Sequence, residues 1–226
     1  MRVQVSRLNL ASEQMEAINY KVRVLIVEDE PLIAENIAMY LNNHDYEVVG
    51  IAYDYEEAIF KLEHEKPDIA LLDINLEGNR DGIDVGKFIQ EQMGIPFVFL
   101  SSYSDKNTLE RAKIVKPSGY LVKPFHEKSL MATLEISLSN FASNNNGQSS
   151  ELNIDKINAL INSPLSHREF EVLQLIYAGK TNQQISQELF ISINTLKRHI
   201  NNAYMRMDIT TRTTAIKKLR ELMLQK

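Results

Sequence analysis

Between residues 21 and 141 the sequence alternates short β-branched segments with longer segments of helical periodicity, five times in succession. This alternation predicts βαβ units, because parallel strands need a long crossover connection, which is usually a helix. Two of the short segments, Val24–Val27 and Phe97–Leu100, contain no polar residue. Parallel strands that are covered on both faces have this composition. We therefore predict an α/β domain over 21–141, with a doubly wound five-stranded parallel sheet.

The predicted strands cover residues 23–27, 47–52, 69–72, 97–100 and 119–122, and the predicted helices lie near 31–43, 55–65, 82–93, 105–113 and 127–141. A change of composition then marks the end of this domain. Residues 143–150 are all Ser, Asn, Gly or Gln, and such a run without an apolar anchor predicts a flexible linker over 142–155. The first twenty residues form an N-terminal extension that the pattern leaves unassigned.

Beyond the linker, apolar residues recur at helical spacing, which predicts four short helices in a small all-α domain over 156–226. The two domains differ in the sign of their charge. Residues 21–141 hold 12 basic and 21 acidic side chains, a net charge of −9, whereas residues 154–226 hold 11 and 6, a net charge of +5. A basic domain indicates a polyanionic partner, and an acidic one suits a cation-binding site or a solvated acidic surface.

No apolar run approaches the ~20 residues that span a bilayer, and polar residues interrupt every apolar stretch of the first twenty residues. The chain also has no cysteine, which agrees with a reducing compartment. From these features we expect a cytoplasmic protein without a membrane partner.

Polar side chains follow four of the five predicted strands. Glu28 and Asp29 come after the first strand, Asp73 after the third, Ser101 after the fourth and Lys123 after the fifth. Ligands of doubly wound sheets bind at this edge. Three carboxylates that meet there would repel one another, and Mg²⁺, which prefers oxygen ligands, would relieve the repulsion. A lysine and a hydroxyl facing the same ion can neutralise the charge on the oxygens of a transferred phosphoryl group while a nucleophile attacks in line. Asp73 is the candidate nucleophile.

Three segments carry a family resemblance: Val24–Glu30, Leu71–Gly82 and Gly119–Phe125. In this order and spacing they resemble the receiver domains of two-component response regulators, over about 120 residues. The resemblance implies a flavodoxin-like sheet with strand order 2-1-3-4-5. It also implies a histidine kinase as the phosphodonor partner.

The same resemblance assigns roles to single residues. Asp73 is the phosphoacceptor, and Mg²⁺ is bound by Asp29, Asp73 and the backbone carbonyl of Asn75, with Glu28 assisting through water. In the same family pattern, Ser101 matches the switch hydroxyl, Lys123 the phosphate-binding lysine and Tyr120 the aromatic residue that turns inward on activation.

The second domain contains a candidate helix-turn-helix. A helix over 182–189 and a turn at 190–192 lead into a helix over 193–205, whose apolar residues fall on one face. The outward positions are Asn194, Lys197, Arg198, Asn201 and Asn202. Lysine and arginine contact phosphates or guanine, and asparagine pairs with adenine, so this face suits the major groove of DNA. A solvated charged face has the same composition.

The wider sequence over 165–173, 179–185, 191–200 and 211–213 resembles the LuxR-type DNA-binding domain over about 60 residues. The resemblance implies contacts to DNA from Lys197, Arg198 and Asn201 and a homodimer on promoter DNA, formed through the last helix near 212–224. The full set of candidate DNA-binding residues is Asn194, Thr195, Lys197, Arg198, Asn201 and Arg212. Met207-Asp208 stands where this family usually has Leu-Gly, which leaves the end of the recognition helix open. His199 either packs or contacts phosphate.

The sequence thus predicts a response regulator, not an enzyme, in which Mg²⁺-dependent phosphorylation of Asp73 alters dimerisation or DNA binding. Phosphorylation either releases the DNA-binding domain or creates a dimer surface. Two alternatives remain: an output domain that binds protein instead of DNA, and a haloacid-dehalogenase-like phosphatase. The phosphatase places a second aspartate two residues after the nucleophile on the first strand, whereas here that position is Asn75 and the nucleophile follows the third strand.

Overall fold

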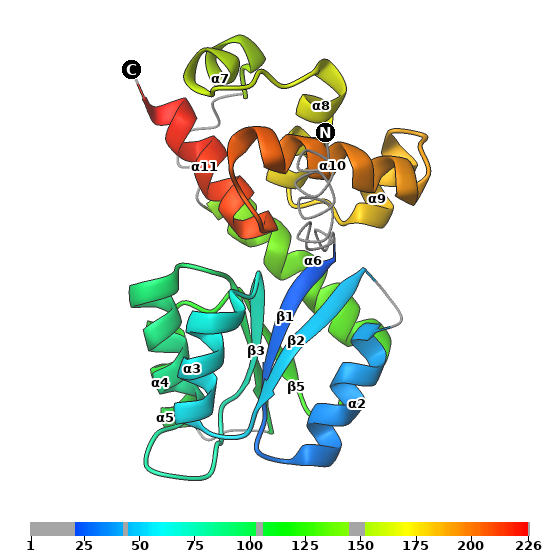
Figure 1. The fold of residues 1–226 in the computed structure, drawn as a ribbon. Helices are drawn as coiled ribbons and strands as arrows, with labels where there is room; N and C mark the ends of the chain where they lie inside the picture. The colour runs from blue at the N-terminus through cyan, green and yellow to red at the C-terminus, as the bar shows by residue number, and fades with distance from the viewer. Residues whose placement is uncertain (1–20, 43–44, 103–105, 145–151, 226) are drawn as a thin grey trace, which may run out of the picture.

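The computed structural model describes residues 21–42, 45–102, 106–144 and 152–225, which form two folded units (Figure 1). The first unit is built on a parallel sheet with strand order β2-β1-β3-β4-β5. Its strands are β1 (Val22–Val27), β2 (Tyr46–Ala52), β3 (Ile69–Asp73), β4 (Phe97–Ser101) and β5 (Gly119–Val122). Both the fold class and the strand order predicted from the sequence are confirmed. The order reverses between β1 and β3, which places a ligand site at the carboxyl ends of these two strands.

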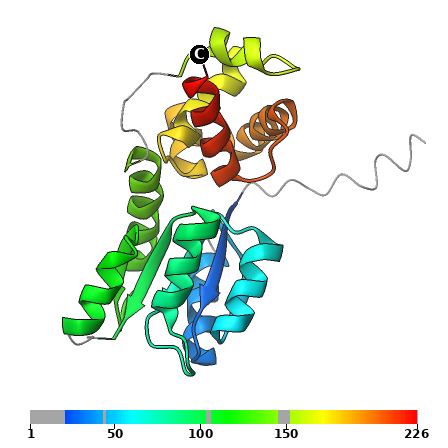
Figure 2. The ribbon, with the colours of Figure 1, turned by 90° about the vertical axis from the view of Figure 1, so that its left-hand side faces the viewer.

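Helices cover both faces of the sheet (Figures 1 and 2). One face packs against α2 (Pro31–Asn42) and α6 (Glu127–Asn144), and the other against α3 (Tyr55–Glu65), α4 (Gly82–Phe88) and α5 (Lys106–Ile114). The segment η1 (Ile89–Met93) continues α4 as a π-helical turn. All five predicted helices are therefore present, and α6 extends three residues beyond its predicted end.

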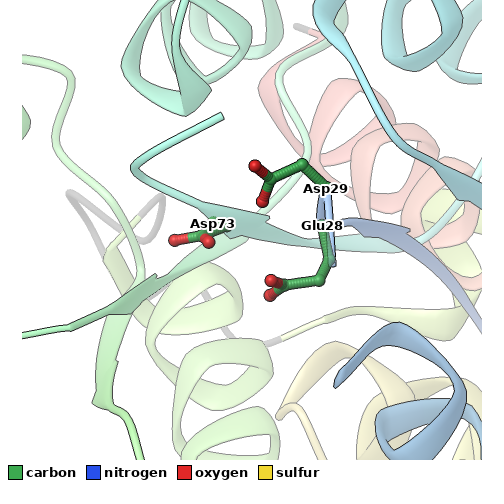
Figure 3. A group of neighbouring side chains, drawn as sticks. All are labelled: Glu28, Asp29 and Asp73. Atoms are coloured by element: carbon green, nitrogen blue, oxygen red, sulfur yellow. The ribbon is translucent and has the colours of Figure 1, made fainter. Parts of the chain in front are cut away.

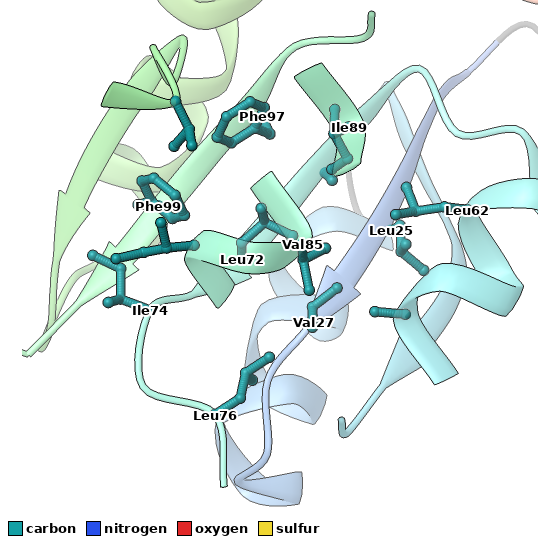
Figure 4. Packing of buried hydrophobic residues seen from close by; sticks show 14 of the residues in the cluster. Leu25, Val27, Leu62, Leu72, Ile74, Leu76, Val85, Ile89, Phe97 and Phe99 are labelled. Carbon is teal, nitrogen blue, oxygen red and sulfur yellow. The ribbon is translucent and has the colours of Figure 1, made fainter. Parts of the chain in front are cut away.

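The alternation of side chains along the strands fills two separate cores. Leu25, Val27, Leu72 and Phe99 point to the face covered by α3, α4 and α5 (Figure 4). The residues between them, such as Ile26, point to the face covered by α2 and α6. Every residue of β3 is buried, because this strand lies in the middle of the sheet with helices on both sides. A rigid, doubly covered strand therefore carries Asp73 at its carboxyl end.

The second unit consists of α7 (Ile154–Leu160), α8 (His167–Tyr177), α9 (Asn182–Glu188), α10 (Ile193–Met207) and α11 (Arg212–Leu224). The four predicted helices correspond to α8 to α11, and the sequence interpretation missed α7. Asn153 caps α7 by accepting the amide of Lys156, and Ile157 is buried in the core of this unit. Residues 145–151 of the predicted linker, and the extension 1–20, lie outside the described residues. Within the described ranges, no helix has the length and apolar character needed to cross a bilayer.

Candidate functional site

The carboxyl ends of β1 and β3 bring three carboxylates together. Glu28 and Asp29 follow β1 directly, Asp73 ends the adjacent strand β3, and one carboxylate oxygen from each lies within 4.8 Å of the other two. Figure 3 shows the three side chains directed into a common space from these two strands. Glu28 is fully buried and Asp73 is 4% exposed. The predicted convergence of acidic groups is thus present in the fold.

Lys123, from the segment after β5, neutralises part of this charge. Its Nζ donates to Oε1 of Glu28 at 2.7 Å and to Oδ2 of Asp73 at 2.8 Å. Burial alone would lower the pKa of Lys123, but its hydrogen bonds to Asp73 and Glu28 outweigh burial and raise the pKa. Burial also raises the pKa of Glu28 from 4.5 to about 7, against the opposing effect of Lys123. The site therefore holds a permanent cation next to closely spaced acidic oxygens.

These residues fit a magnesium ion. Octahedral Mg²⁺ with bonds of about 2.1 Å places neighbouring ligand oxygens about 3 Å apart and opposite ones about 4.2 Å apart. The oxygens of Glu28, Asp29 and Asp73 lie within 4.8 Å of one another, which is close to the span of the ligand shell of one such ion. The donor set contains only hard oxygen ligands, which Mg²⁺ prefers over the nitrogen and sulfur ligands of softer metals.

The segment between β3 and α4 fixes the phosphoacceptor candidate through its backbone. The amide of Asn75 donates to Oδ1 of Asp73 at 3.3 Å, and the amide of Glu77 donates to Oδ2 of Asp29 at 3.3 Å. Gly82 begins α4 so close to β3 that a Cβ at this position would lie 1.8 Å from the backbone oxygen of Asp73. The Asp81-Gly82 pair is thus explained, because Asp81 caps α4 through its side chain and only glycine fits next to it.

Ser101 and Tyr120 lie on neighbouring strands beside this cluster. Ser101 ends β4, is 5% exposed, and its carbonyl accepts the amide of Lys123 at 2.8 Å. Tyr120 is 38% exposed, and its ring centroid lies 5.7 Å from that of Phe99. The structure therefore places Ser101 at the same sheet edge as the carboxylates and leaves Tyr120 partly exposed, with its ring beside that of the buried Phe99.

In the second unit, α9 and α10 form a helix-turn-helix. Thr181 caps α9 in a capping box with Gln184, and Ser192 caps α10 by accepting the amide of Thr195. The buried face of α10 consists of Leu196, Ile200, Ala203, Tyr204 and Met207. The helix therefore packs on one side and leaves the opposite side for a partner.

Five of the candidate DNA-binding residues lie on α10, and the sixth, Arg212, begins α11. Asn194, Thr195, Lys197, Arg198 and Asn201 lie on α10, where Asn194 and Arg198 are exposed and the other three are half-buried. Asn194 and Arg198 lie on the side of α10 opposite its buried residues, and the other three lie between the two sides. His199 is also half-buried. Burial is the main cause that lowers its pKa, and the positive charges of Arg168 and Arg198 lower the pKa further.

Arg212 departs from the sequence-based prediction. It is 6% exposed, and its Nη2 donates to the backbone carbonyls of Ile176 and Lys180. Burial lowers the pKa of Arg212, and the nearby hydroxyl of Tyr204 and carboxylate of Asp68 oppose this effect. In this structure Arg212 is a structural residue at the start of α11 and is not available to DNA. The basic character of a residue and its place in the family pattern do not reveal that its side chain turns inward.

Asp208 settles the end of the recognition helix. It is the C-cap residue of α10 in the left-handed conformation, with φ of 53°, which glycine adopts without steric cost.

Replacing Asp208 by glycine should raise the free energy of unfolding by about 0.5 kcal/mol. Thermal denaturation of the full chain measures this change. The Asp208→Ala variant is the control, because alanine retains the Cβ and should bring no gain; equal stabilisation by both would contradict the explanation.

The fold and the site together define the class of response regulators. The first domain has a doubly wound parallel sheet with an acidic cluster and a lysine at its carboxyl edge, and a helix-turn-helix domain follows it. The family models agree: residues 24–135 match the response regulator receiver domain, and residues 163–219 match the LuxR family of bacterial regulatory proteins. The chain belongs to the response regulators that join a receiver domain to a LuxR-type DNA-binding domain.

Individual relatives are similar over both domains. The chain is 32% identical to the transcriptional regulatory protein LiaR of Bacillus subtilis, over 86% of this chain and 94% of LiaR. It is 29% identical to the response regulator VraR of Staphylococcus aureus, over 86% of this chain and 94% of VraR. Among solved structures, the receiver domain of a modulated diguanylate cyclase from Desulfovibrio desulfuricans G20 aligns with a TM-score of 0.52 and 35% identity, over 54% of this chain and 97% of that one.

Proposed function

We propose that Asp73 receives a phosphoryl group from a histidine kinase in a Mg²⁺-dependent reaction, and that this modification controls binding of a homodimer to promoter DNA. The observation that supports the phosphorylation site best is the convergence of Glu28, Asp29, Asp73 and Lys123 from three strands on one buried location. Phosphoryl transfer needs such a site, because charge on the transferred group must be neutralised while a nucleophile attacks in line.

Each residue has a defined task in this reaction. An Oδ of Asp73 attacks the phosphorus atom, the bond between phosphorus and the kinase imidazole breaks, and the imidazole retains the electron pair and takes up a proton. Glu28, Asp29 and Asp73 would hold Mg²⁺, which neutralises charge on the phosphoryl oxygens when it is bound. The Nζ of Lys123 already lies 2.8 Å from Asp73 and would pair with the same oxygens. Ser101, at the adjacent strand end, would donate its hydroxyl to the product.

The acyl phosphate is a signal in this proposal and not a catalytic intermediate. The position two residues after Asp73 is Asn75, which cannot serve as the general acid that a phosphatase of the alternative class requires. The modification adds roughly two negative charges beside Lys123. These charges shift the equilibrium between two conformations of the receiver. The chain therefore acts as a transcription regulator.

We assign DNA contacts to α10, through its exposed residues Asn194 and Arg198 and its half-buried residues Thr195, Lys197 and Asn201, and omit Arg212 because it is buried. A two-fold symmetric dimer would recognise two related half-sites.

A mobility-shift assay with genomic fragments, performed before and after treatment with a small phosphodonor, tests the proposal. We expect sequence-selective complexes whose affinity changes on phosphorylation. The absence of any DNA complex in both states would favour a protein-binding output domain instead.

A further inference from the structure

A cavity of about 490 Å³ lies between α6, the start of β2 and the start of α9. Asp45 and Tyr46 line it from the start of β2, and Thr181 and Gln183 line it from the start of α9. Oδ2 of Asp45 accepts the backbone amide of Gln183 at 2.7 Å, which brings these two segments together. The lining includes no residue of the phosphoacceptor site and none of the residues assigned to DNA, so the proposed function does not account for this cavity.

The side chains around the cavity are predominantly acidic. Glu127 and Glu135 on α6 line it together with Asp45, and Lys128 is the basic side chain among the lining residues. One basic and three acidic groups give the lining a net charge of −2. The three carboxylates are half-buried, whereas Lys128 is exposed to solvent. Because a concave surface with one sign of charge concentrates the electrostatic potential, the cavity favours a cation.

Tyr46 adds a polar group without a partner to this acidic lining. The residue is 2% exposed, and its ring packs in the core between the sheet and helices α2 and α6. Its hydroxyl is buried and has no hydrogen-bond partner in the described part of the chain. Burial raises the pKa of Tyr46, and the carboxylate of Glu135 raises it further, whereas the guanidinium of Arg212 lowers it. The hydroxyl thus lies near Glu135 at the wall of the cavity. A buried hydroxyl without a partner is unfavourable, and a ligand in the cavity supplies one.

The spacing of the carboxylates fits an elongated organic cation better than a metal ion. Among the described residues, the phosphoacceptor cluster is the one group of three acidic side chains whose oxygens lie within 4.8 Å of one another. Glu127 and Glu135 are two turns apart on α6, about 12 Å along the helix axis. Met131 and Ala132 lie between these glutamates on α6 and give the cavity an apolar wall for a carbon chain. The cavity volume is also in the range of small-molecule sites.

We propose that this cavity binds a linear organic polycation that carries a primary ammonium group at each end. One terminal ammonium pairs with Glu135 and donates to the hydroxyl of Tyr46, and the other pairs with Glu127. The carbon chain between them lies along Met131, and Asp45 adds to the attraction from the opposite wall. The site goes beyond the proposed function, and its test requires neither phosphorylation nor DNA.

The first measurement is a titration of the full chain with spermidine, a linear triamine with a primary ammonium at each end. Methionine methyl groups labelled with ¹³C report binding by NMR, because Met131 lines this cavity and Met205 on α10 lines a different one. We expect a saturable shift of the Met131 methyl signal, with a dissociation constant below about 1 mM, and no shift of the Met205 signal. Raising the salt concentration should weaken binding. The absence of a saturable change at Met131 would overturn the proposal.

A pair of charge variants separates this site from a general attraction to the acidic receiver. Glu135→Gln keeps the shape of the side chain and removes its charge, so it should weaken spermidine binding about tenfold. Glu63→Gln is the matched control, because it removes the same charge from an exposed position on α3 and should leave the affinity unchanged. Equal weakening by the two variants would mean that spermidine is held by the net charge of the receiver and not by this cavity.

The Tyr46→Phe variant tests the hydroxyl without changing the charge of the cavity. It should weaken spermidine binding, and it should not lower the melting temperature of the ligand-free protein, because the hydroxyl has no hydrogen bond to lose. A lower melting temperature together with unchanged binding would show that the hydroxyl serves the fold and not the ligand.

A short series of ligands tests the chemistry of the occupant. Spermidine acetylated at both ends keeps its length but loses both terminal charges, and it should not shift the Met131 signal. Putrescine is a shorter diamine and should bind more weakly than spermidine, because it cannot reach Glu127 and Glu135 together. Mg²⁺ at the same concentration should leave the Met131 signal in place. Equal binding of the acetylated ligand or of putrescine, or an equal shift by Mg²⁺, would overturn the assignment to an elongated polycation.

Discussion

Incubated with a small phosphodonor and Mg²⁺, the wild-type protein should gain the mass of one phosphoryl group per chain, and the Asp73→Asn variant should gain none. The amide of asparagine is not a nucleophile, although it has nearly the same shape as the carboxylate. Asp73 is the carboxylate that Lys123 contacts at the end of the central strand, at 2.8 Å. Intact-mass spectrometry measures the difference directly, and removing Mg²⁺ with a chelator should abolish incorporation in the wild-type protein.

Asp54→Asn is the matched control for this experiment. Asp54 caps α3 after β2, at the same edge of the sheet, and accepts the amide of Glu57. Asparagine is an equally good N-cap residue, so this variant should fold and take up phosphate normally. Phosphoryl incorporation into the Asp73→Asn protein, or its loss from the Asp54→Asn protein, would contradict the assignment of Asp73.

The receiver site could be predicted from the sequence because each part of it depends on local patterns. Uninterrupted apolar segments indicated the buried strands, and the polar residue after each segment had to lie at one edge of a parallel sheet. Glu28, Asp29, Asp73 and Lys123 are brought together by this topology alone. The sequence could not indicate that the amide of Glu77 donates to Asp29, because every residue except proline has such a donor.

Contacts between distant residues explain where the sequence interpretation failed. Arg212 is buried because the carbonyls of Ile176 and Lys180 accept its hydrogen bonds. These partners lie more than thirty residues away in the sequence, so no local pattern indicates them. The contact of Asp68 with Thr213 spans 145 residues. Helix α7 was missed for a different reason: it begins at Ile154, inside the range 142–155 that the polar run led us to interpret as a linker.

The largest effect on DNA binding is expected from removing two charges of α10 together. Lys197 and Arg198 are adjacent on α10, where Arg198 is exposed and Lys197 is half-buried, whereas Leu196 is fully buried. If each subunit of a dimer makes about three phosphate contacts, the logarithm of the affinity should fall with the logarithm of salt concentration with a slope of roughly −5. Replacing both residues by alanine removes up to about four of these contacts, so the slope should approach roughly −2.

The affinity of the Lys197→Ala/Arg198→Ala variant at physiological salt should fall by roughly a hundredfold or more, because each lost charged contact weakens binding to every sequence. Lys87→Ala/Lys128→Ala is the matched control, since it removes two positive charges from exposed positions on receiver helices α4 and α6 and none from α10 or α11. Fluorescence anisotropy over a series of salt concentrations gives slope and affinity together. An unchanged slope in the Lys197→Ala/Arg198→Ala variant would mean that DNA contacts a different surface, because release of counterions depends on the number of phosphates that the protein neutralises and not on the stability of its fold.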